Sequence, residues 1–238
     1  MDDLKNIIAG TCLLVNKPLE WTSFDVVNKV RHTIRSSYDL KKIKVGHAGT
    51  LDPLATGLLI LCTGKMTKQI DSYQGQDKIY MGEMHLGATT PSYDRELDVD
   101  NTYPIDHISE LDIYQTATCF VGEIEQIPPA FSAIKKDGIP LYKLARAGKK
   151  VRPQPRKVQV HQLDITKIEL PIVSFTVRCS KGTYIRSLAH DFGKRLGSGA
   201  YLSKLCRTAI GSHVLEDAWN LDELIDAIKN SAHEYSSQ

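Results

Sequence analysis

Residues 45–64 read VGHAGTLDPLATGLLILCTG, and in this stretch a polar loop runs into an apolar segment. The apolar segment Leu58–Cys62 has the length and composition of a strand that is buried on both faces. Two glycines and a proline stand around Asp52, and these residue types mark turns and close approaches of the backbone. We therefore expect Asp52 on a loop anchored to the core by a buried strand, which is a setting typical of reactive side chains.

Asp52 also has a purely structural interpretation. An aspartate that precedes a proline, here Pro53, is a common turn former because its side chain can bond to nearby backbone. The local pattern leaves both interpretations open.

The segments before this loop predict a strand followed by a helix. Residues 11–18, TCLLVNKP, have the character of a short buried strand that ends at Pro18. Thr22 or Ser23 can cap the helix that follows. Its apolar face would consist of Val26, Val27, Val30 and Ile34.

The middle of the chain predicts a helix over 65–73, a strand over 77–87 and a helix over 106–120. In the strand, Tyr80 and Met84 would share one face. The core stripe of the second helix would consist of Ile108, Leu111, Tyr114 and Ala117.

The rest of the chain predicts a long loop, two strands and a further helix. Prolines and glycines make 125–158 mostly loop, with a short helix at Leu141–Ala147. Two strands, 158–170 and 172–180, precede a helix in 181–197, with Tyr184 and Arg186 in its first turn. Without a regular βαβ alternation, this order favours the α+β class with a largely antiparallel sheet.

The composition limits the possible classes of protein. A chain of 238 residues with 42% hydrophobic residues can build one large core, so we expect a single domain over residues 1–238. No run approaches the ~18 apolar residues of a membrane span, and the first residues do not resemble a secretory leader. We expect a cytoplasmic protein with no membrane association. The five cysteines are isolated, and the histidines show no ligand spacing, so we expect free thiols and no metal.

The charge is unevenly distributed although the net charge is only +2. Basic residues predominate in Lys29–Lys44, Lys135–Val158 and Arg178–Arg207, whereas Glu83–Glu125 is acidic. If the basic segments share one face, they form a surface that can bind phosphates. They could equally be solvated faces of ordinary helices and strands.

The segment GHAGTLDPLATGLL (46–59) resembles the catalytic motif of the TruB family, the tRNA pseudouridine-55 synthases. The resemblance covers nearly the whole chain, with further similar blocks in the family's order at 13–27, 77–87, 128–148, 179–197 and 201–211. It implies the pseudouridine synthase fold, a mixed and mostly antiparallel sheet flanked by helices with a central active-site cleft. It also implies isomerisation of an everted uridine in the TΨC loop of tRNA, without a cofactor.

Three positions match the family's catalytic residues. Asp52 matches the catalytic aspartate, and a carboxylate ionised at neutral pH can act as a nucleophile or a base. Tyr80 matches a tyrosine that stacks on the target base, although a core aromatic is the simpler interpretation for a strand residue. Arg186 matches the arginine that pairs with the catalytic carboxylate, although most arginines are merely solvated.

Five positions match residues that surround the substrate. His47 matches the histidine that inserts into the RNA loop, and Tyr184 a second pocket tyrosine. Leu205 matches an aliphatic residue that closes over the uracil. Lys17 and Pro18 match a pair that supports the pocket.

The chain departs from the family pattern at two places. The family's TxTxDxxG stretch is altered at 90–97, so no catalytic role is carried over to Asp94. Many members continue into a PUA domain, and we expect none here. Three alternatives for cleaving the glycosidic bond stay open, namely attack at C1′, addition at C6 and a glycal route. An RNA-binding or tRNA-folding module, and a synthase acting on ribosomal or messenger RNA, are the competing functions. We expect a monomer that binds tRNA.

Overall fold

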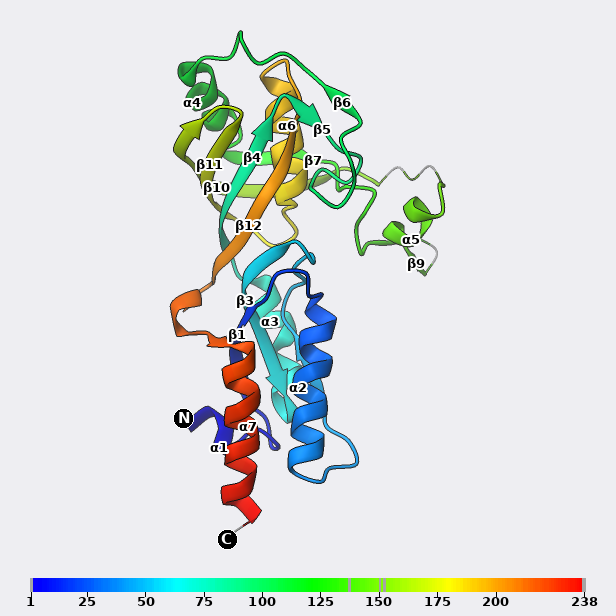
Figure 1. Cartoon of the computed structure of the whole chain (residues 1–238), viewed down its shortest axis with the longest axis vertical. Coiled ribbons are helices and arrows are strands. Elements are labelled where there is room, and N and C mark those ends of the chain that lie inside the picture. The colour runs from blue at the N-terminus through cyan, green and yellow to red at the C-terminus, as the bar shows by residue number, and fades with distance from the viewer. Residues whose placement is uncertain (1, 137, 150, 152, 237–238) are drawn as a thin grey trace. The chain divides into compact units, whose positions relative to one another are not determined.

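The computed structural model describes residues 2–136, 138–149, 151 and 153–236. The chain forms two compact units, coloured along the sequence in Figure 1. Unit 1 consists of Met1–Tyr80 and Cys206–Gln238, and unit 2 is Met81–Leu205. The chain passes from one unit to the other within the strands β4 (Lys78–Leu86) and β12 (Ala200–Ile210).

Unit 1 is built on the strands β1 (Cys12–Lys17) and β3 (Ala55–Thr63), which pair antiparallel. The short strand β2 (Val45–His47) pairs with β3, and β14 (Trp219–Asn220) pairs parallel with β1. The remaining elements outside the two shared strands are α1 (Asp2–Lys5), α2 (Ser23–Ser37), η1 (Gly64–Gln69), α3 (Ile70–Gly75), β13 (His213–Val214), η2 (Leu215–Asp217) and α7 (Leu221–Ser236).

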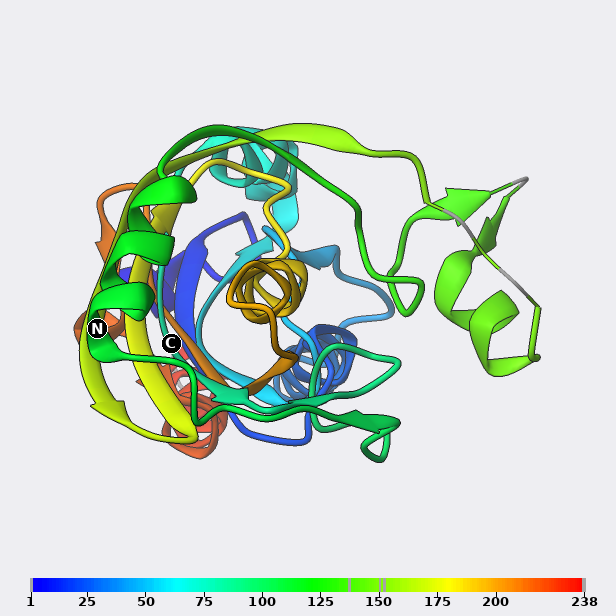
Figure 2. The ribbon, with the colours of Figure 1, turned by 90° about the horizontal axis from the view of Figure 1, so that it is seen from above.

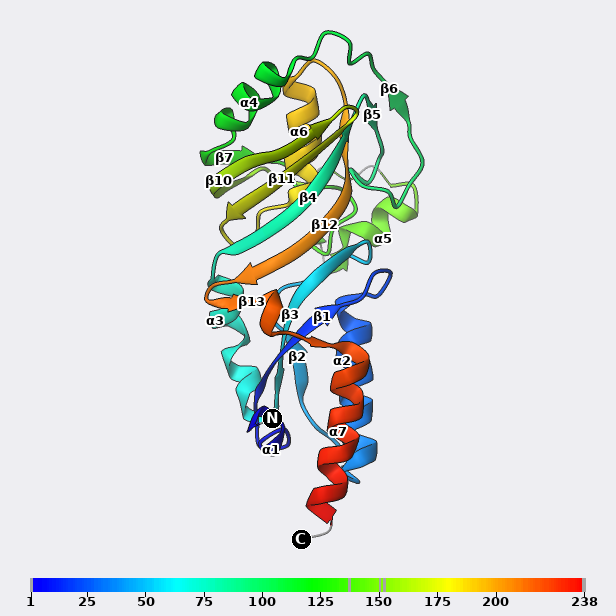
Figure 3. The ribbon, with the colours of Figure 1, turned by 60° about the vertical axis from the view of Figure 1, so that its left-hand side comes forward.

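Strand β3 is buried because helices cover both of its faces. Leu59 and Leu61 belong to the core cluster formed with α2 and α7, which lie side by side in Figures 1 and 3. Leu58 and Ile60 belong to a second cluster, against which residues of η1 and α3 pack. A strand covered on both faces has no polar face, so its sequence is a continuous apolar run. The predicted buried strand at 58–62 is confirmed.

Unit 2 contains the strand order β4–β11–β10–β7, in which β10 (Arg156–Glu169) pairs antiparallel with both β11 (Ile172–Cys179) and β7 (Gly122–Gln126). Figure 2 looks along the axis of α6 (Ile185–Arg195). The other elements are β5 (Ala88–Thr89), β6 (Asn101–Thr102), α4 (Glu110–Cys119), β8 (Lys135–Lys136), β9 (Ile139–Pro140) and α5 (Leu141–Arg146). Antiparallel pairing predominates, which confirms the predicted α+β class.

The predicted core stripe of the helix at 106–120 is wrong in part, because Ile108 and Ala117 are buried but Leu111 and Tyr114 are not. Helix α4 begins only at Glu110, and Leu111 and Tyr114 are 64% and 48% exposed. Within the helix, the buried face consists of Ala117 together with Ile113 and Thr116, and Phe120 beyond the helix stacks on Phe192 of α6 at 5.7 Å. The predicted stripe advanced three residues at each step, which drifts around a helix of 3.6 residues per turn.

Most other predicted elements are present. Strand β1 is found where 11–18 predicted it, and Thr22 caps α2. The helix predicted at 65–73 is the 3-10 segment η1 followed by α3. Within the part of the chain that the structure describes, no helix is long and apolar enough to cross a membrane.

Candidate functional site

Asp52 lies half-buried on the loop between β2 and β3, as the sequence predicted. The loop begins where the Ala48 amide donates to the Ile60 carbonyl at 2.9 Å. It ends in a turn in which the Ala55 amide donates to the Asp52 carbonyl at 3.1 Å. The backbone of Asp52 is therefore fixed by bonds on both sides of it.

The beginning of α2 also holds this loop. The buried hydroxyl of Ser23 donates to the Leu51 carbonyl at 3.1 Å and accepts from the Leu51 amide at 2.8 Å. The amide of Glu20 donates to the carbonyl of Pro53 at 2.8 Å. The residues directly before and after Asp52 are thus bonded to neighbouring segments.

Lys17, at the end of β1, has a fully buried side chain. Its ammonium donates to the carbonyls of Pro18 at 2.8 Å, Trp21 at 2.6 Å and Pro53 at 3.4 Å. Burial lowers the pKa of Lys17 to about 8, and the charge of Asp52 opposes this shift. Lys17 thus bonds the segment on which Asp52 lies, and its supporting role beside Pro18 stays a prediction.

His47 closes β2 and is half-buried. Burial lowers the pKa of His47 below its ordinary value, and the positive charge of Arg207 lowers it further. The imidazole is therefore neutral at neutral pH, which suits contact with a nucleobase better than pairing with a phosphate. Tyr80, the last residue of the first of the two segments of unit 1, is 8% exposed, which is also compatible with a core aromatic.

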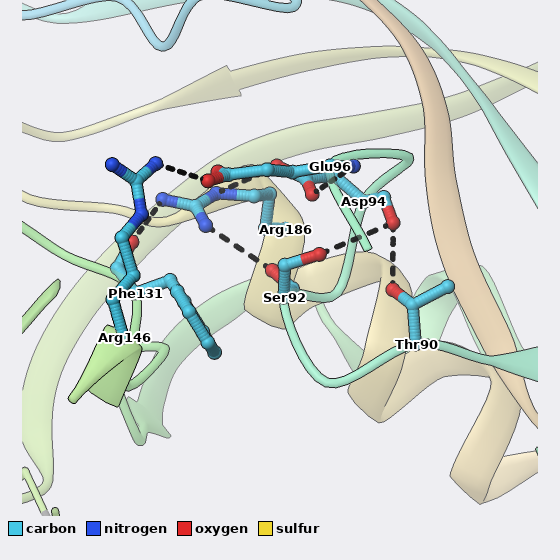
Figure 4. A network of polar contacts seen from close by, with 7 residues as sticks. All are labelled: Thr90, Ser92, Asp94, Glu96, Phe131, Arg146 and Arg186. Carbon is cyan, nitrogen blue, oxygen red and sulfur yellow. Dashed lines mark hydrogen bonds and ion pairs between the residues drawn. The ribbon is translucent and has the colours of Figure 1, made fainter. Parts of the chain in front are cut away.

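Arg186 of unit 2 is buried, with 4% of its surface exposed. Figure 4 shows its guanidinium among Asp94, Ser92 and Phe131. Its Nη1 donates to the Ser92 carbonyl at 3.1 Å and its Nη2 to the Phe131 carbonyl at 2.9 Å. Its Nε lies 3.6 Å from Oδ2 of Asp94. The interpretation of Arg186 as a solvated surface arginine is wrong.

Asp94 is a residue that the sequence reasoning set aside. It is 5% exposed, and its Oδ1 accepts from the amide of Glu96 at 2.9 Å. Its carbonyl accepts from the hydroxyl of Thr90 at 2.6 Å. The family's aspartate at this position was the available signal, although the residues after it differ. The loop at 90–96 is thus shaped around a buried carboxylate that faces Arg186.

Tyr184 and Leu205 also belong to unit 2. Tyr184 is the N-cap residue of α6, and the side-chain amide of Gln126 bonds both its amide and its carbonyl, at 2.8 and 2.9 Å. The guanidinium of Arg156 lies 5.3 Å from the centre of its ring. Leu205 is half-buried in β12.

The predicted site residues are thus distributed over both units. Lys17, Pro18, His47, Asp52 and Tyr80 belong to unit 1, whereas Tyr184, Arg186 and Leu205 belong to unit 2. The pairing of Arg186 with Asp52 stays a prediction. Among the described residues, no three His, Cys, Asp or Glu side chains are grouped as a metal site would require.

Comparisons with known proteins cover most of the chain. A model of the TruB family pseudouridylate synthase, N terminal domain, matches residues 35–185. The tRNA pseudouridine synthase B of Flavobacterium johnsoniae is 54% identical over 89% of this chain and 93% of its own length. The protein of that name from Parabacteroides distasonis is 48% identical over 95% of this chain and 96% of its own length.

The fold is similar to that of a solved structure of an H/ACA RNP bound to a substrate RNA containing 2′-deoxyuridine. The match has a TM-score of 0.67 and 29% sequence identity over 93% of this chain, which spans 54% of the solved one. The family model and the relatives at about 50% identity together show the family. This chain belongs to the TruB family of pseudouridylate synthases.

Proposed function

We propose that this chain isomerises uridine 55 in the TΨC loop of tRNA to pseudouridine, with Asp52 as the catalytic carboxylate. The observation that carries the proposal is the position of Asp52, half-buried on a loop whose residues on either side are bonded to neighbouring segments. The relatives named tRNA pseudouridine synthase B support tRNA as the substrate.

The reaction breaks the bond between N1 and C1′ and joins C5 to C1′. The proton at C5 leaves to solvent and N1 gains a proton, so no redox partner or cofactor is required. A carboxylate suits the first step, because it can attack C1′ or C6 or take a proton from the sugar. Asp52 supplies this carboxylate, because it is the acidic residue on the loop between β2 and β3.

The base must leave its stack before a carboxylate can reach its glycosidic bond. We infer that His47, neutral at physiological pH, contacts the RNA loop as the base leaves it. Tyr80 and Tyr184 would stack on the everted uracil, and Leu205 would close over it. Phosphates of the TΨC arm would meet the basic segments, so binding should weaken as salt rises.

We further propose that Arg186 orients the carboxylate of Asp52 and that Asp94 keeps Arg186 in place. The bonds from Arg186 to the carbonyls of Ser92 and Phe131, together with the carboxylate of Asp94, leave this guanidinium few alternative rotamers. We also propose that the chain acts as a single catalytic domain and a monomer in the cytoplasm, with neither metal nor cofactor.

Release of tritium from tRNA labelled at C5 of its uridines tests the proposal. The wild-type protein should release tritium in proportion to the pseudouridine formed at position 55. Asp52→Asn should release none while still binding tRNA. Asp71→Asn, which makes the same change at an exposed helical residue of unit 1, is the matched control and should keep full activity.

Each competing function has its own outcome in this experiment. Full tritium release by Asp52→Asn would refute the catalytic role of Asp52. Tight tRNA binding without any release by the wild type would indicate an RNA-binding or tRNA-folding module. Release from ribosomal or messenger RNA fragments but not from tRNA would indicate a synthase with another substrate.

A further inference from the structure

Arg207 in β12 is the largest side chain in the fully buried core, with 1% of its surface exposed. It belongs to unit 1, and none of the roles described above includes it. Burying a guanidinium is costly unless its N–H groups find acceptors. Its acceptors are therefore informative about its purpose.

The acceptors of Arg207 lie on the two sides of Asp52. Nε donates to the carbonyl of Leu58 at 2.8 Å, and Nη2 donates to the carbonyl of Gly49 at 3.1 Å. Gly49 precedes Asp52 in the loop, and Leu58 lies in β3 after the loop has ended. One planar fork thus joins the two ends of the segment that presents Asp52.

The backbone of Arg207 reinforces this connection. Gly57 has φ +102°, and a Cβ added there would lie 2.3 Å from the carbonyl oxygen and 2.6 Å from the amide nitrogen of Arg207. A side chain at position 57 would therefore push β12 away from the loop. Glycine permits the close approach that brings the guanidinium within reach of both carbonyls.

The surroundings of Arg207 explain why its charge is tolerated. Lys17 is also buried, and the positive charge of Arg207 lowers its pKa whereas the negative charge of Asp52 raises it. His47 avoids a third positive charge in this region, because its pKa is lowered. The carboxylate of Asp52 supplies the opposite charge in this group, since it interacts with the ammonium of Lys17.

We propose that Arg207 is a positioning residue, which fixes the Asp52 loop in its reactive geometry by joining the carbonyls of Gly49 and Leu58. This inference rests on the proposed function of Asp52. Arginine has the required geometry, since its fork donates from two separate nitrogens, Nε and Nη2, whereas all donors of a lysine lie on its one terminal nitrogen. Displacement of a catalytic group by about 1 Å can cost on the order of 100-fold in rate.

Arg207→Lys is the deciding variant, because it keeps the positive charge and removes the fork. We expect kcat to fall about 100-fold, while KM and the Kd for tRNA stay within about twofold of the wild type. Arg207→Gln, whose amide is too short to join both carbonyls, should show the same separation of kcat from KM. It supplies the test if the lysine variant does not fold.

Ile228→Val in α7 is the control for a general loss of stability. This residue is fully buried in unit 1, and its side chain packs in the core cluster of α2 and α7. It should lower Tm and leave kcat unchanged. If Arg207→Lys keeps wild-type kcat at a temperature where it is folded, the positioning role is refuted. Failure of the proposed function looks different, since the wild type itself would then release no tritium or Asp52→Asn would stay active.

Discussion

Two buried arginines, one in each unit, are stabilised in different ways. Arg186 in unit 2 faces the carboxylate of Asp94 and two carbonyls from separate loops. Arg207 in unit 1 donates to two carbonyls that belong to the segment around Asp52. The positive charge of Arg186 is therefore neutralised by the carboxylate of Asp94. The positive charge of Arg207 instead adds to that of Lys17. We call Arg186 with Asp94, Ser92 and Phe131 the Arg186 cluster. We call Arg207 with Gly49, Leu58 and the nearby Lys17 the Arg207 cluster.

This difference has a consequence for the free energy of unfolding. Removal of one partner from a buried ion pair leaves an uncompensated charge, which is costly. The Arg186 cluster should therefore be sensitive to loss of its acid. The Arg207 cluster should instead be sensitive to pH, because Lys17 in its neighbourhood has a lowered pKa.

The largest expected effect is that of Asp94→Ala. It should lower the free energy of unfolding by about 3–5 kcal/mol, because Arg186 would stay buried without its carboxylate. Urea denaturation measures this loss, and Asp98→Ala on the exposed part of the same loop should change stability by less than about 0.5 kcal/mol.

A double variant separates stability from activity in the Arg186 cluster. Asp94→Leu combined with Arg186→Met replaces the buried pair by apolar side chains of similar size, which is often neutral for stability. We expect stability near that of the wild type together with loss of tritium release. Retained turnover in this folded double variant would contradict the role of Arg186.

The second effect concerns the pH dependence at Lys17. Below pH 8 this lysine is charged in both the folded and the unfolded state. Between about pH 8 and the ordinary lysine value of 10.5, the folded state releases the proton first, so stability rises with pH. Relative to Lys17→Met, the wild type should gain up to about 1.4 kcal/mol per pH unit in this window. Denaturation at several pH values measures the slope, and a difference that stays flat would contradict the burial of a charged lysine.

The third effect compares two helix caps of the same kind. Thr22 caps α2 and Ser109 caps α4, each with an aspartate three residues later in a capping box. Replacement of either by alanine should cost about 1 kcal/mol. Thr22→Ala should also lower kcat, since Ser23 beside it bonds Leu51, whereas Ser109→Ala should leave kcat unchanged. If both variants had the same kcat, the start of α2 would have no influence on the geometry of the Asp52 loop.

The smallest expected effect is that of Arg146→Ala. Arg146 bonds Glu96 at the edge of the Arg186 cluster (Figure 4), but its side chain is 61% exposed. Exposed ion pairs contribute about 0–1 kcal/mol, so stability should change within that range. Thermal denaturation measures this change in stability. A loss above that range would mean that the exposed pair of Arg146 and Glu96 contributes to the stability of the Arg186 cluster.

The fold could be predicted where local pattern and burial agree. The apolar run of β3 and the capped, periodic α2 were predictable because a single segment carries their signal. Helix α7 was not predicted, although Leu221, Leu224 and Ile228 are buried at helical spacing. The stripe of α4 failed because only the packing partner decides which face of a weakly amphipathic helix is buried.

The site could be predicted only in part from the sequence. The loop position of Asp52 follows from its neighbouring glycines and proline, and the family motif adds its role. The partners of the two buried arginines could not be predicted, since Arg207 lies 158 positions from Gly49 and Arg186 lies 94 positions from Ser92. Contacts over such separations arise from tertiary packing, and local sequence periodicity carries no information about them.

The paired bond between Ser23 and Leu51 has a consequence for the motions of the loop. Backbone amides on loops ordinarily exchange their hydrogen with deuterated water within a short time, since they bond only to solvent. The amide of Leu51 donates instead to a buried hydroxyl. Deuterium uptake at this amide should therefore be as slow as in a strand, and the loop should open only when the first turn of α2 unravels.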